Sequence, residues 1–191
     1  MGTRQLDFSK NKIQQEFLKC NTRFQNFSGG FGSGKTTACC FKTQLISALM
    51  PNNMGVIARN TYPDLRDTTR KVFMEILNPS WYKYWKESEN ALTFKNNSTI
   101  LFRHFETGKI KVGASLGWFF IDQAEEANEE IFKGLVGRLR REVPRRFGML
   151  AMNPNGQDWQ YKLFVKDQNP NYAHFDSTTY DNKDNLPDGY I

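Results

Sequence analysis

One short glycine-rich segment limits what this chain can fold into. Gly29–Thr36 reads Gly-Gly-Phe-Gly-Ser-Gly-Lys-Thr, with two glycines, a lysine and a hydroxyl residue at fixed spacing. The alternation over 23–27 predicts a strand before it, and the spacing of Phe41, Leu45 and Leu49 predicts a helix after it. Glycines let a backbone approach an anion closely, and a helix N-terminus directs N–H groups at that anion. The segment therefore predicts a phosphate-binding loop, or P-loop, in a nucleotide-binding α/β fold.

The candidate nucleotide-binding residues follow from this motif. Lys35 is expected to reach the β- and γ-phosphates of a nucleotide, and the Thr36 hydroxyl to bind Mg²⁺. A loop whose lysine only faces solvent is the structural alternative, but strand, loop and helix all agree with the full pattern. The other candidate binding positions are Gly29, Gly30, Phe31, Gly32, Ser33, Gly34 and Thr37.

The rest of the chain alternates between strand-like and helix-like patterns. The hydrophobic spacing predicts strands over 54–58, 117–121 and 149–152, an extended stretch over 172–179, and a hairpin formed by 92–94 and 99–102. It predicts helices after Asn11, over 35–50, from Thr61 to Leu77, from near Gln123 and over 159–165. We therefore expect residues 1–191 to form a single P-loop NTPase domain. Its mainly parallel central sheet is flanked by helices and carries a small β-hairpin insertion.

Composition narrows the class of protein further. The longest apolar stretches span only a few residues, which predicts no membrane span. Three cysteines, two of them the adjacent pair Cys39 and Cys40, fit neither a disulfide framework nor a zinc site and favour a reducing compartment.

An acidic segment follows the predicted strand 117–121. Asp122 ends that strand and is the candidate second Mg²⁺ ligand, although an aspartate here could serve only as a helix N-cap. The next residue is Gln123, which cannot act as a base. The role of positioning or deprotonating water is therefore expected for a nearby carboxylate. Glu125 is preferred because it lies about one helical turn after Asp122 and would share its face, with Glu126 as second choice. The structural alternative is that both glutamates only stabilise a helix N-terminus.

The positive charge is concentrated downstream. The net charge is +6, and segment 133–146 holds six bases against one acid. This segment could grip DNA phosphates or supply an arginine finger to a neighbouring subunit, with Arg138 and Arg140 as candidates and Lys109 and Lys111 as alternatives. A solvated helix end whose arginines pair with nearby glutamates is the structural alternative.

Two further groups have candidate roles. Asn153 ends the predicted strand 149–152, where its amide could sense the γ-phosphate or simply form a turn. The aromatic residues of segment 81–85 are predicted to pack over the hairpin rather than to stack on bases.

In order along the chain, these motifs resemble the large terminase subunits of tailed phages. The resemblance covers Gln14, the P-loop, segment 59–67, the Asp122 segment, the arginine-rich stretch 137–141, segment 151–156, and the closing turn 178–187. It departs from the family at Phe31, where many members have a basic residue. The Asp122 segment resembles the variant of the family's Walker B motif that has Gln after Asp, here Gln123.

The resemblance implies a function. The chain is expected to be the N-terminal ATPase domain of a packaging motor that hydrolyses ATP with Mg²⁺ and translocates double-stranded DNA into a procapsid. It implies that Gln14 reads the adenine and that Asn153 couples hydrolysis to movement. The implied partners are double-stranded DNA, identical subunits in a ring, the portal protein and the small terminase subunit, in the cytoplasm of the infected bacterium. The family's nuclease domain is expected to be absent from residues 1–191.

Two other functions remain open from the residues alone. A small P-loop nucleotide kinase would use segment 138–146 as an arginine-bearing lid. A nucleotide-gated nucleic-acid-binding module with weak hydrolysis is compatible with Gln123.

Overall fold

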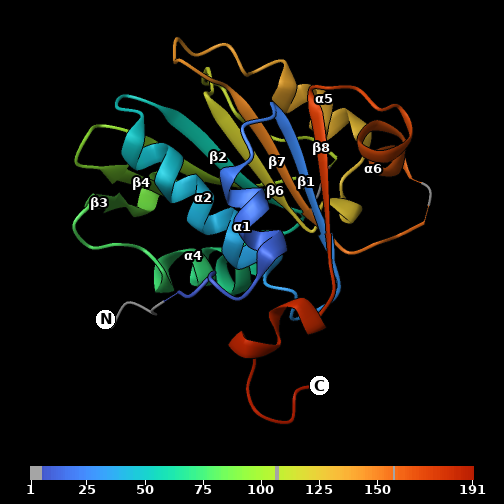
Figure 1. Ribbon diagram of the computed structural model, residues 1–191. Coiled ribbons are helices and arrows are strands. Elements are labelled where there is room, and N and C mark those ends of the chain that lie inside the picture. The colour runs from blue at the N-terminus through green and yellow to red at the C-terminus, as the bar shows by residue number, and fades with distance from the viewer. Residues whose placement is uncertain (1–5, 106–107, 157) are drawn as a thin grey trace.

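A computed structural model describes residues 6–105, 108–156 and 158–191 and forms one twisted sheet between two layers of helices (Figure 1). The sheet has eight strands in the order β3-β4-β5-β2-β6-β7-β1-β8. The parallel strands, from β5 to β8 in that order, are β5 (Thr99–His104), β2 (Met54–Arg59), β6 (Trp118–Asp122), β7 (Phe147–Met152), β1 (Phe24–Gly29) and β8 (Tyr172–Ser177). The predicted fold class is confirmed.

The antiparallel end of the sheet contains the predicted hairpin. β4 (Ala91–Phe94) pairs with β5 around Asn97, whose φ of 64° suits the tight turn. A strand that the sequence analysis did not predict, β3 (Tyr82–Lys86), extends this end, and the short 3₁₀ turn Glu87–Glu89 joins it to β4. Trp81, Tyr82 and Trp85 pack against the core, as predicted for the aromatic group, while Tyr84 is exposed.

Each face of the sheet is buried under its own set of helices. On one face lie α1 (Lys12–Lys19), α2 (Lys35–Leu49) and α4 (Lys71–Glu75), which pack Phe17, Cys39 and Phe73 onto the strands. On the other lie α5 (Glu129–Val136) and the turns near α6 (Trp159–Tyr161). The central strands are buried on both faces, which is the normal condition of parallel strands. Within the described parts of the chain, no helix is long and apolar enough to cross a membrane.

The helix predicted from Thr61 to Leu77 is interrupted. Thr61 caps α3 (Tyr62–Asp64) as expected, but a π-helical segment, Leu65–Arg70, follows before α4 begins. Such wide turns are rare and are frequent at functional sites. The predicted helix over 159–165 likewise continues from α6 into a π-helical segment, Lys162–Lys166.

The long acidic helix predicted from Gln123 is wrong. Gln123 adopts a left-handed conformation with φ of 50°, and a single 3₁₀ turn, Ala124–Glu126, follows it. The helix α5 starts only at Glu129, where the Asn128 side chain accepts a hydrogen bond from the Ile131 amide at 3.0 Å. The left-handed residue stops the chain from continuing as an α-helix, which the acidic composition could not reveal.

A buried lysine fastens α1 to the sheet. Lys42 of α2 donates to the carbonyl oxygens of Phe17 and Cys20 and to Gln25 Oε1, the last at 2.6 Å. Burial lowers the pKa of Lys42 to about 8. The ammonium thus serves as a hydrogen-bond donor to the end of α1 without a carboxylate partner among these contacts.

We predict that replacing Lys42 with Met destabilises the fold by about 1–3 kcal/mol, because three buried acceptors lose their donor. Between about pH 8 and the ordinary lysine pKa of 10.5, the unfolded chain holds a proton on Lys42 that the native protein has released. Wild-type stability therefore rises through this window relative to Lys42→Met. Urea unfolding of both proteins at pH 8 and pH 10 measures the difference; a constant gap would contradict the assigned pKa.

Candidate functional site

The P-loop has the shape of an anion cradle at the carboxyl ends of the parallel strands. It leaves β1 at Gly29 and enters α2 at Lys35, and Gly34 adopts a φ of 79° that favours glycine. A Cβ at Gly34 would lie 2.2 Å from Gln14 Nε2, and one at Gly29 would lie 2.5 Å from the Ser177 carbonyl oxygen. The backbone of the loop therefore requires glycine at both positions.

Lys35 lies across the mouth of this loop. Its Nζ donates to Asn153 Oδ1 at 2.9 Å and to the Gly30 carbonyl oxygen at 3.3 Å. Burial lowers the pKa of Lys35, whereas the nearby carboxylates of Asp122 and Glu125 act in the opposite direction. The ammonium is thus held by neutral oxygen acceptors in a position that an anionic phosphate could take over.

The two predicted Mg²⁺ ligands meet. The Thr36 hydroxyl donates to Asp122 Oδ1 at 2.9 Å, across the gap between the start of α2 and the end of β6. Asp122 is 1% exposed, so its charge is removed from bulk water. A hydroxyl and a carboxylate oxygen are donors that Mg²⁺ prefers, and the pair therefore fits the ion that the sequence analysis assigned to it.

Arg59 is a site residue to which the sequence analysis gave no role. It ends β2 beside β6, is 8% exposed, and its Nη1 lies 3.5 Å from Asp122 Oδ2. Its Nη2 donates to Gln123 Oε1, which ties down the residue in the left-handed conformation. The available sequence signal was a basic residue at the end of a strand, next to a buried acid.

The π-helical segment Leu65–Arg70 supplies the remaining contacts of this cluster. Thr69 donates from its hydroxyl to Asp122 Oδ2 at 2.5 Å, and Arg59 Nη1 donates to the Thr68 and Thr69 hydroxyls. The widened turn places two successive hydroxyl side chains on the same cluster. Sequence periodicity predicted an ordinary helix here and could not find these contacts.

Asn153 joins the lysine to one of the two candidate glutamates. Its Nδ2 donates to Glu125 Oε1 at 2.6 Å, while its Oδ1 accepts from Lys35. The other oxygen, Glu125 Oε2, is buried and has no hydrogen-bond partner among the described residues. Glu125 thus reaches the site through Asn153, and not through the helical turn from Asp122 on which its prediction relied.

Glu126 faces a different set of groups. Burial raises its pKa, with the Glu125 and Asp64 carboxylates adding to the shift, while Arg59 and Asn60 oppose it. The side chain is more exposed than that of Glu125. The two adjacent glutamates therefore lie in different environments, one linked to Lys35 and one beside Arg59.

Gln14 lies behind the P-loop, next to the C-terminal segment. Its Nε2 donates to the Ser33 carbonyl oxygen at 3.0 Å and to Asn182 Oδ1 at 3.3 Å. Asn182 in turn donates to the Gly32 carbonyl oxygen at 2.7 Å. The 3₁₀ segment Tyr180–Asn185 therefore folds back onto the P-loop, a contact between the two ends of the chain that local sequence could not reveal.

The P-loop, Arg59, Asp122 and the C-terminal segment line a cavity of about 290 Å³. Phe31, one of its lining residues, is 74% exposed, and its side chain carries no charge. The lining includes Phe31, Gly32, Gly34, Lys35, Thr36, Thr37, Arg59, Asp122, Gln123, Asn182, Asn185 and Leu186.

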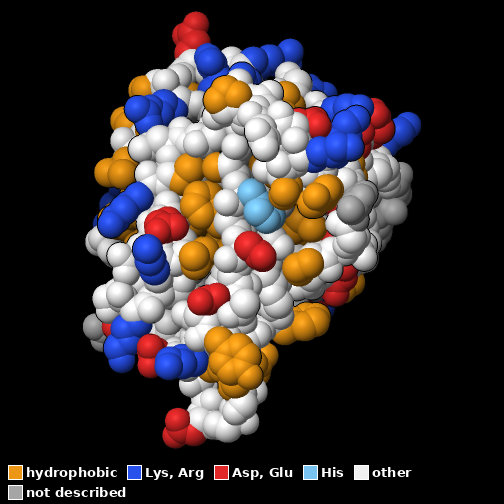
Figure 2. Space-filling model, turned by 45° about the vertical axis from the view of Figure 1, so that its right-hand side comes forward, with side chains coloured by type: hydrophobic (Ala, Val, Ile, Leu, Met, Phe, Trp, Pro, Cys, Tyr) orange, Lys and Arg blue, Asp and Glu red, His pale blue; other side chains and the backbone are white. Residues whose placement is uncertain are grey.

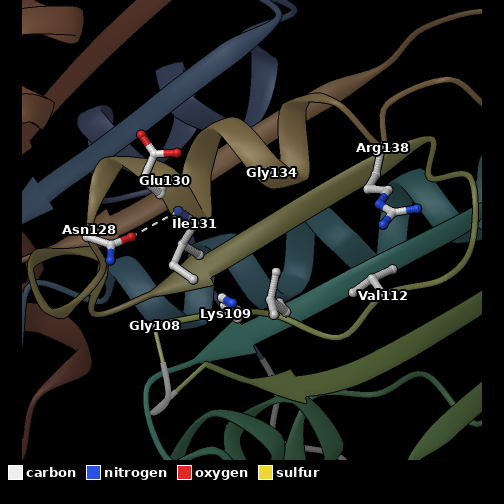
Figure 3. A pocket seen from close by; sticks show the side chains of 9 residues that line it. Gly108, Lys109, Val112, Asn128, Glu130, Ile131, Gly134 and Arg138 are labelled. Carbon is white, nitrogen blue, oxygen red and sulfur yellow. Dashed lines mark hydrogen bonds between the residues drawn. The ribbon is translucent and has the colours of Figure 1, made fainter.

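The two arginine-finger candidates lie elsewhere. The Arg138 carbonyl accepts from the Leu116 amide, and Arg140 Nε donates to Ser115 Oγ, both contacts being just before β6 begins. Asp122 ends the same strand, so these arginines lie at the opposite edge of the sheet from their own P-loop. Arg138 also lines a separate cavity of about 520 Å³ between α5 and segment 108–112, together with Lys109 and Glu130 (Figure 3).

The fold and the loop geometry define a P-loop NTPase: a parallel sheet, a glycine cradle leading into a helix, and an aspartate at the end of a nearby strand. A family model described as phage terminase large subunit matches residues 21–191. The chain therefore belongs to the phage terminase large subunit family, as the sequence motifs predicted.

Individual relatives agree with this assignment. The PBSX phage terminase large subunit of Bacillus subtilis (strain 168) is 27% identical over 150 residues, which cover 76% of this chain and 34% of that protein. The large terminase of a thermophilic bacteriophage has a similar structure, with a TM-score of 0.78 and 18% identity over 93% of this chain and 48% of that one. The chain thus spans about a third of the first relative and about half of the second.

A third comparison covers nearly all of both chains. The large terminase ATPase domain of Thermus phage P74-26 has a TM-score of 0.66 and 14% identity, over 97% of this chain and 89% of that one. This likeness supports the fold of the described residues as that of a terminase ATPase domain.

We predict that replacing Arg59 with Met lowers the free energy of unfolding by about 3–5 kcal/mol, because the buried Asp122 carboxylate loses its compensating charge. Arg59→Lys keeps the charge but cannot hydrogen-bond to Gln123 and Thr68 while it also pairs with Asp122. Its free energy of unfolding should therefore fall by less than that of Arg59→Met. Urea unfolding of wild type and both variants measures the order of their stabilities. Equal stability of Arg59→Met and wild type would contradict a compensating role.

Proposed function

We propose that this chain hydrolyses ATP with Mg²⁺. The observation that carries the proposal is the set of contacts at one sheet edge: Lys35 with Asn153, Asn153 with Glu125, and Thr36 with Asp122, all within 2.9 Å. A related terminase has been solved in complex with ADP and with ATP-γ-S, which supports a nucleotide as the ligand here.

The residues divide the work of binding and charge stabilisation. The P-loop amides and Lys35 hold the β- and γ-phosphates, while Gln14 and Asn182 shape the loop near the base. Thr36 and Asp122 would hold Mg²⁺, which supplies charge neutralisation for the phosphates when it is bound. Arg59 keeps the Asp122 carboxylate oriented toward Thr36.

Glu125 is the residue that we propose orients and deprotonates the attacking water. Its Oε1 is fixed by Asn153, which leaves the buried Oε2 to accept a hydrogen bond from water. Because Asn153 also contacts Lys35, loss of the γ-phosphate would change the contact between Lys35 and the Asn153 amide. This connection supports the predicted sensor and coupling role of Asn153.

We further propose that hydrolysis drives the translocation of double-stranded viral DNA within a ring of identical subunits. Membership of the terminase family supports this function, with the portal protein and the small terminase subunit as partners in the cytoplasm of the infected bacterium. Since Arg138 and Arg140 lie far from their own P-loop, either would act as an arginine finger only on the nucleotide of a neighbouring subunit.

Replacing Lys35 with Ala is expected to abolish turnover, because the site loses the cation that contacts the phosphates. Exposed Lys83 on β3 offers a matched control, and Lys83→Ala should retain wild-type activity. Release of phosphate from γ-labelled ATP, with and without duplex DNA, measures the effect. Label that appears on a nucleoside monophosphate instead of as free phosphate would make the protein a kinase and overturn the proposal.

The two glutamates can be separated by isosteric amides. Glu125→Gln should lower turnover at least about 100-fold while leaving ATP affinity within a few-fold of wild type, because only the base is lost. Glu126→Gln is the matched control and should keep most of the activity. Single-turnover hydrolysis together with binding of a fluorescent ATP analogue measures both quantities. The reverse pattern would assign the role to Glu126.

A further inference from the structure

The amino-terminal edge of the sheet carries a row of arginines. Parallel strands begin at one edge and end at the other, so the starts of four adjacent strands, β2, β6, β7 and β1, lie side by side. The row consists of Arg23, Arg140, Arg141, Arg145 and Arg146, and is called the arginine row below. Figure 1 places the loop between α5 and β7 at the end of the molecule opposite the C-terminal segment.

Side-chain hydrogen bonds and position in the chain fix the row to the strand starts. Arg141 Nε donates to the Asn52 carbonyl just before β2 at 2.7 Å, and Arg140 Nε to Ser115 Oγ just before β6 at 3.2 Å. Arg146 directly precedes β7, and Arg23 directly precedes β1. Neighbouring strands are about 4.8 Å apart, so four of them set the arginines along roughly 14 Å.

One end of the row forms a pocket. Arg23, Arg145 and Arg146 line a cavity of about 490 Å³ together with Pro144 and Pro170. The two prolines restrict the backbone on either side, and all three arginines are exposed. The remaining lining residues of this cavity, Asn21, Thr22, Phe147 and Asn171, carry no charge.

The charge of the row is not neutralised within the described parts of the chain. No ion pair there involves any of its arginines. Arg140, Arg141 and Arg146 donate from Nε, so their terminal nitrogens are not used in these hydrogen bonds. Segment 140–146 contains one carboxylate, Glu142, against four arginines. In Figure 2, Lys and Arg side chains lie along this upper end together with an acidic side chain at its tip, and others lie elsewhere on the face.

We propose that the arginine row binds the phosphodiester backbone of duplex DNA. A single phosphate would engage the forks of one or two guanidinium groups, whereas a row of about 14 Å matches the roughly 12 Å width of the major groove between its two backbones. Contacts to phosphates carry no direct sequence information, which suits a motor that acts on any sequence. This inference rests on the proposed function, since DNA is there the translocated substrate.

The placement also separates the two ligands. The nucleotide cavity lies at the carboxyl ends of the strands, about 17 Å away along a five-residue strand such as β6. DNA on the arginine row would therefore leave the P-loop open to nucleotide. β6 and β7 run directly from the row to Asp122 and Asn153, so a rigid pair of strands connects the two sites.

The test compares two variants that lose equal charge. One combines Arg23→Ala, Arg145→Ala and Arg146→Ala; the control combines Lys12→Ala, Lys71→Ala and Lys83→Ala, all exposed lysines away from the row. Fluorescence anisotropy with a 30-base-pair duplex, titrated over a series of KCl concentrations, gives affinity and its salt dependence. Each phosphate contact contributes about 0.9 to the slope of log affinity against log salt.

The row variant is expected to lose about 2–3 from the magnitude of that slope and at least about ten-fold in affinity at low salt. The control variant should keep most of both, and Arg→Lys at the three row positions should restore the slope. Thermal unfolding and binding of a fluorescent ATP analogue, unchanged in the row variant, would show that the fold and the P-loop are intact.

Three results would overturn the proposal: equal slopes for row and control variants, displacement of the duplex by millimolar inorganic phosphate at constant ionic strength, or equally tight, row-dependent binding of single strands. ATP turnover measured without DNA in the same preparations keeps the two proposals distinguishable. If ATP turnover depends on Lys35 but DNA binding does not depend on the arginine row, only this inference is wrong. If there is no ATP turnover, the proposed function is wrong.

Discussion

The buried carboxylate of Asp122 is the interaction around which the site is organised. A charge that is 1% exposed is tolerated only when nearby groups compensate it, and here Thr36, Thr69 and Arg59 do so from three different elements. The start of α2, the π-helical segment and the end of β2 are therefore all held to the end of β6. The unusual backbone of Gln123 belongs to the same arrangement, because Arg59 binds its side chain.

The parallel sheet places the site at one end of the strands and the arginine-rich segment at the other. All strands from β5 to β8 end at one edge, so β1 delivers the P-loop, β6 delivers Asp122 and β7 delivers Asn153 to a common place. The same geometry sends everything that precedes these strands to the opposite edge, including the arginine-rich segment. Residues close in sequence to the acidic segment are thereby separated from it by the length of a strand.

The two contacts of Asn153 connect the P-loop lysine to a carboxylate of the acidic segment. Its Oδ1 accepts from Lys35 and its Nδ2 donates to Glu125, so one amide joins the ammonium to the carboxylate. β7 ends at Met152, so Asn153, the first residue of the Asn-Pro-Asn-Gly sequence, stands directly at the end of the strand.

The sequence by itself determined the P-loop, the parallel α/β fold, the cap at Thr61, the meeting of Thr36 with Asp122, and the family. The family was indicated by the order of the motifs along the chain. The other features follow from local rules: glycines where the backbone must approach an anion, alternation for strands, and a polar residue directly after a buried strand. Only the tertiary structure decided the roles of Arg59 and Thr69, the break at Gln123, the contact of Asn182 with the P-loop, and the far position of Arg138 and Arg140. The reason is physical, because each of these features depends on contacts between residues that are distant in sequence. Helical periodicity does not reveal at which end of the strands a segment will lie.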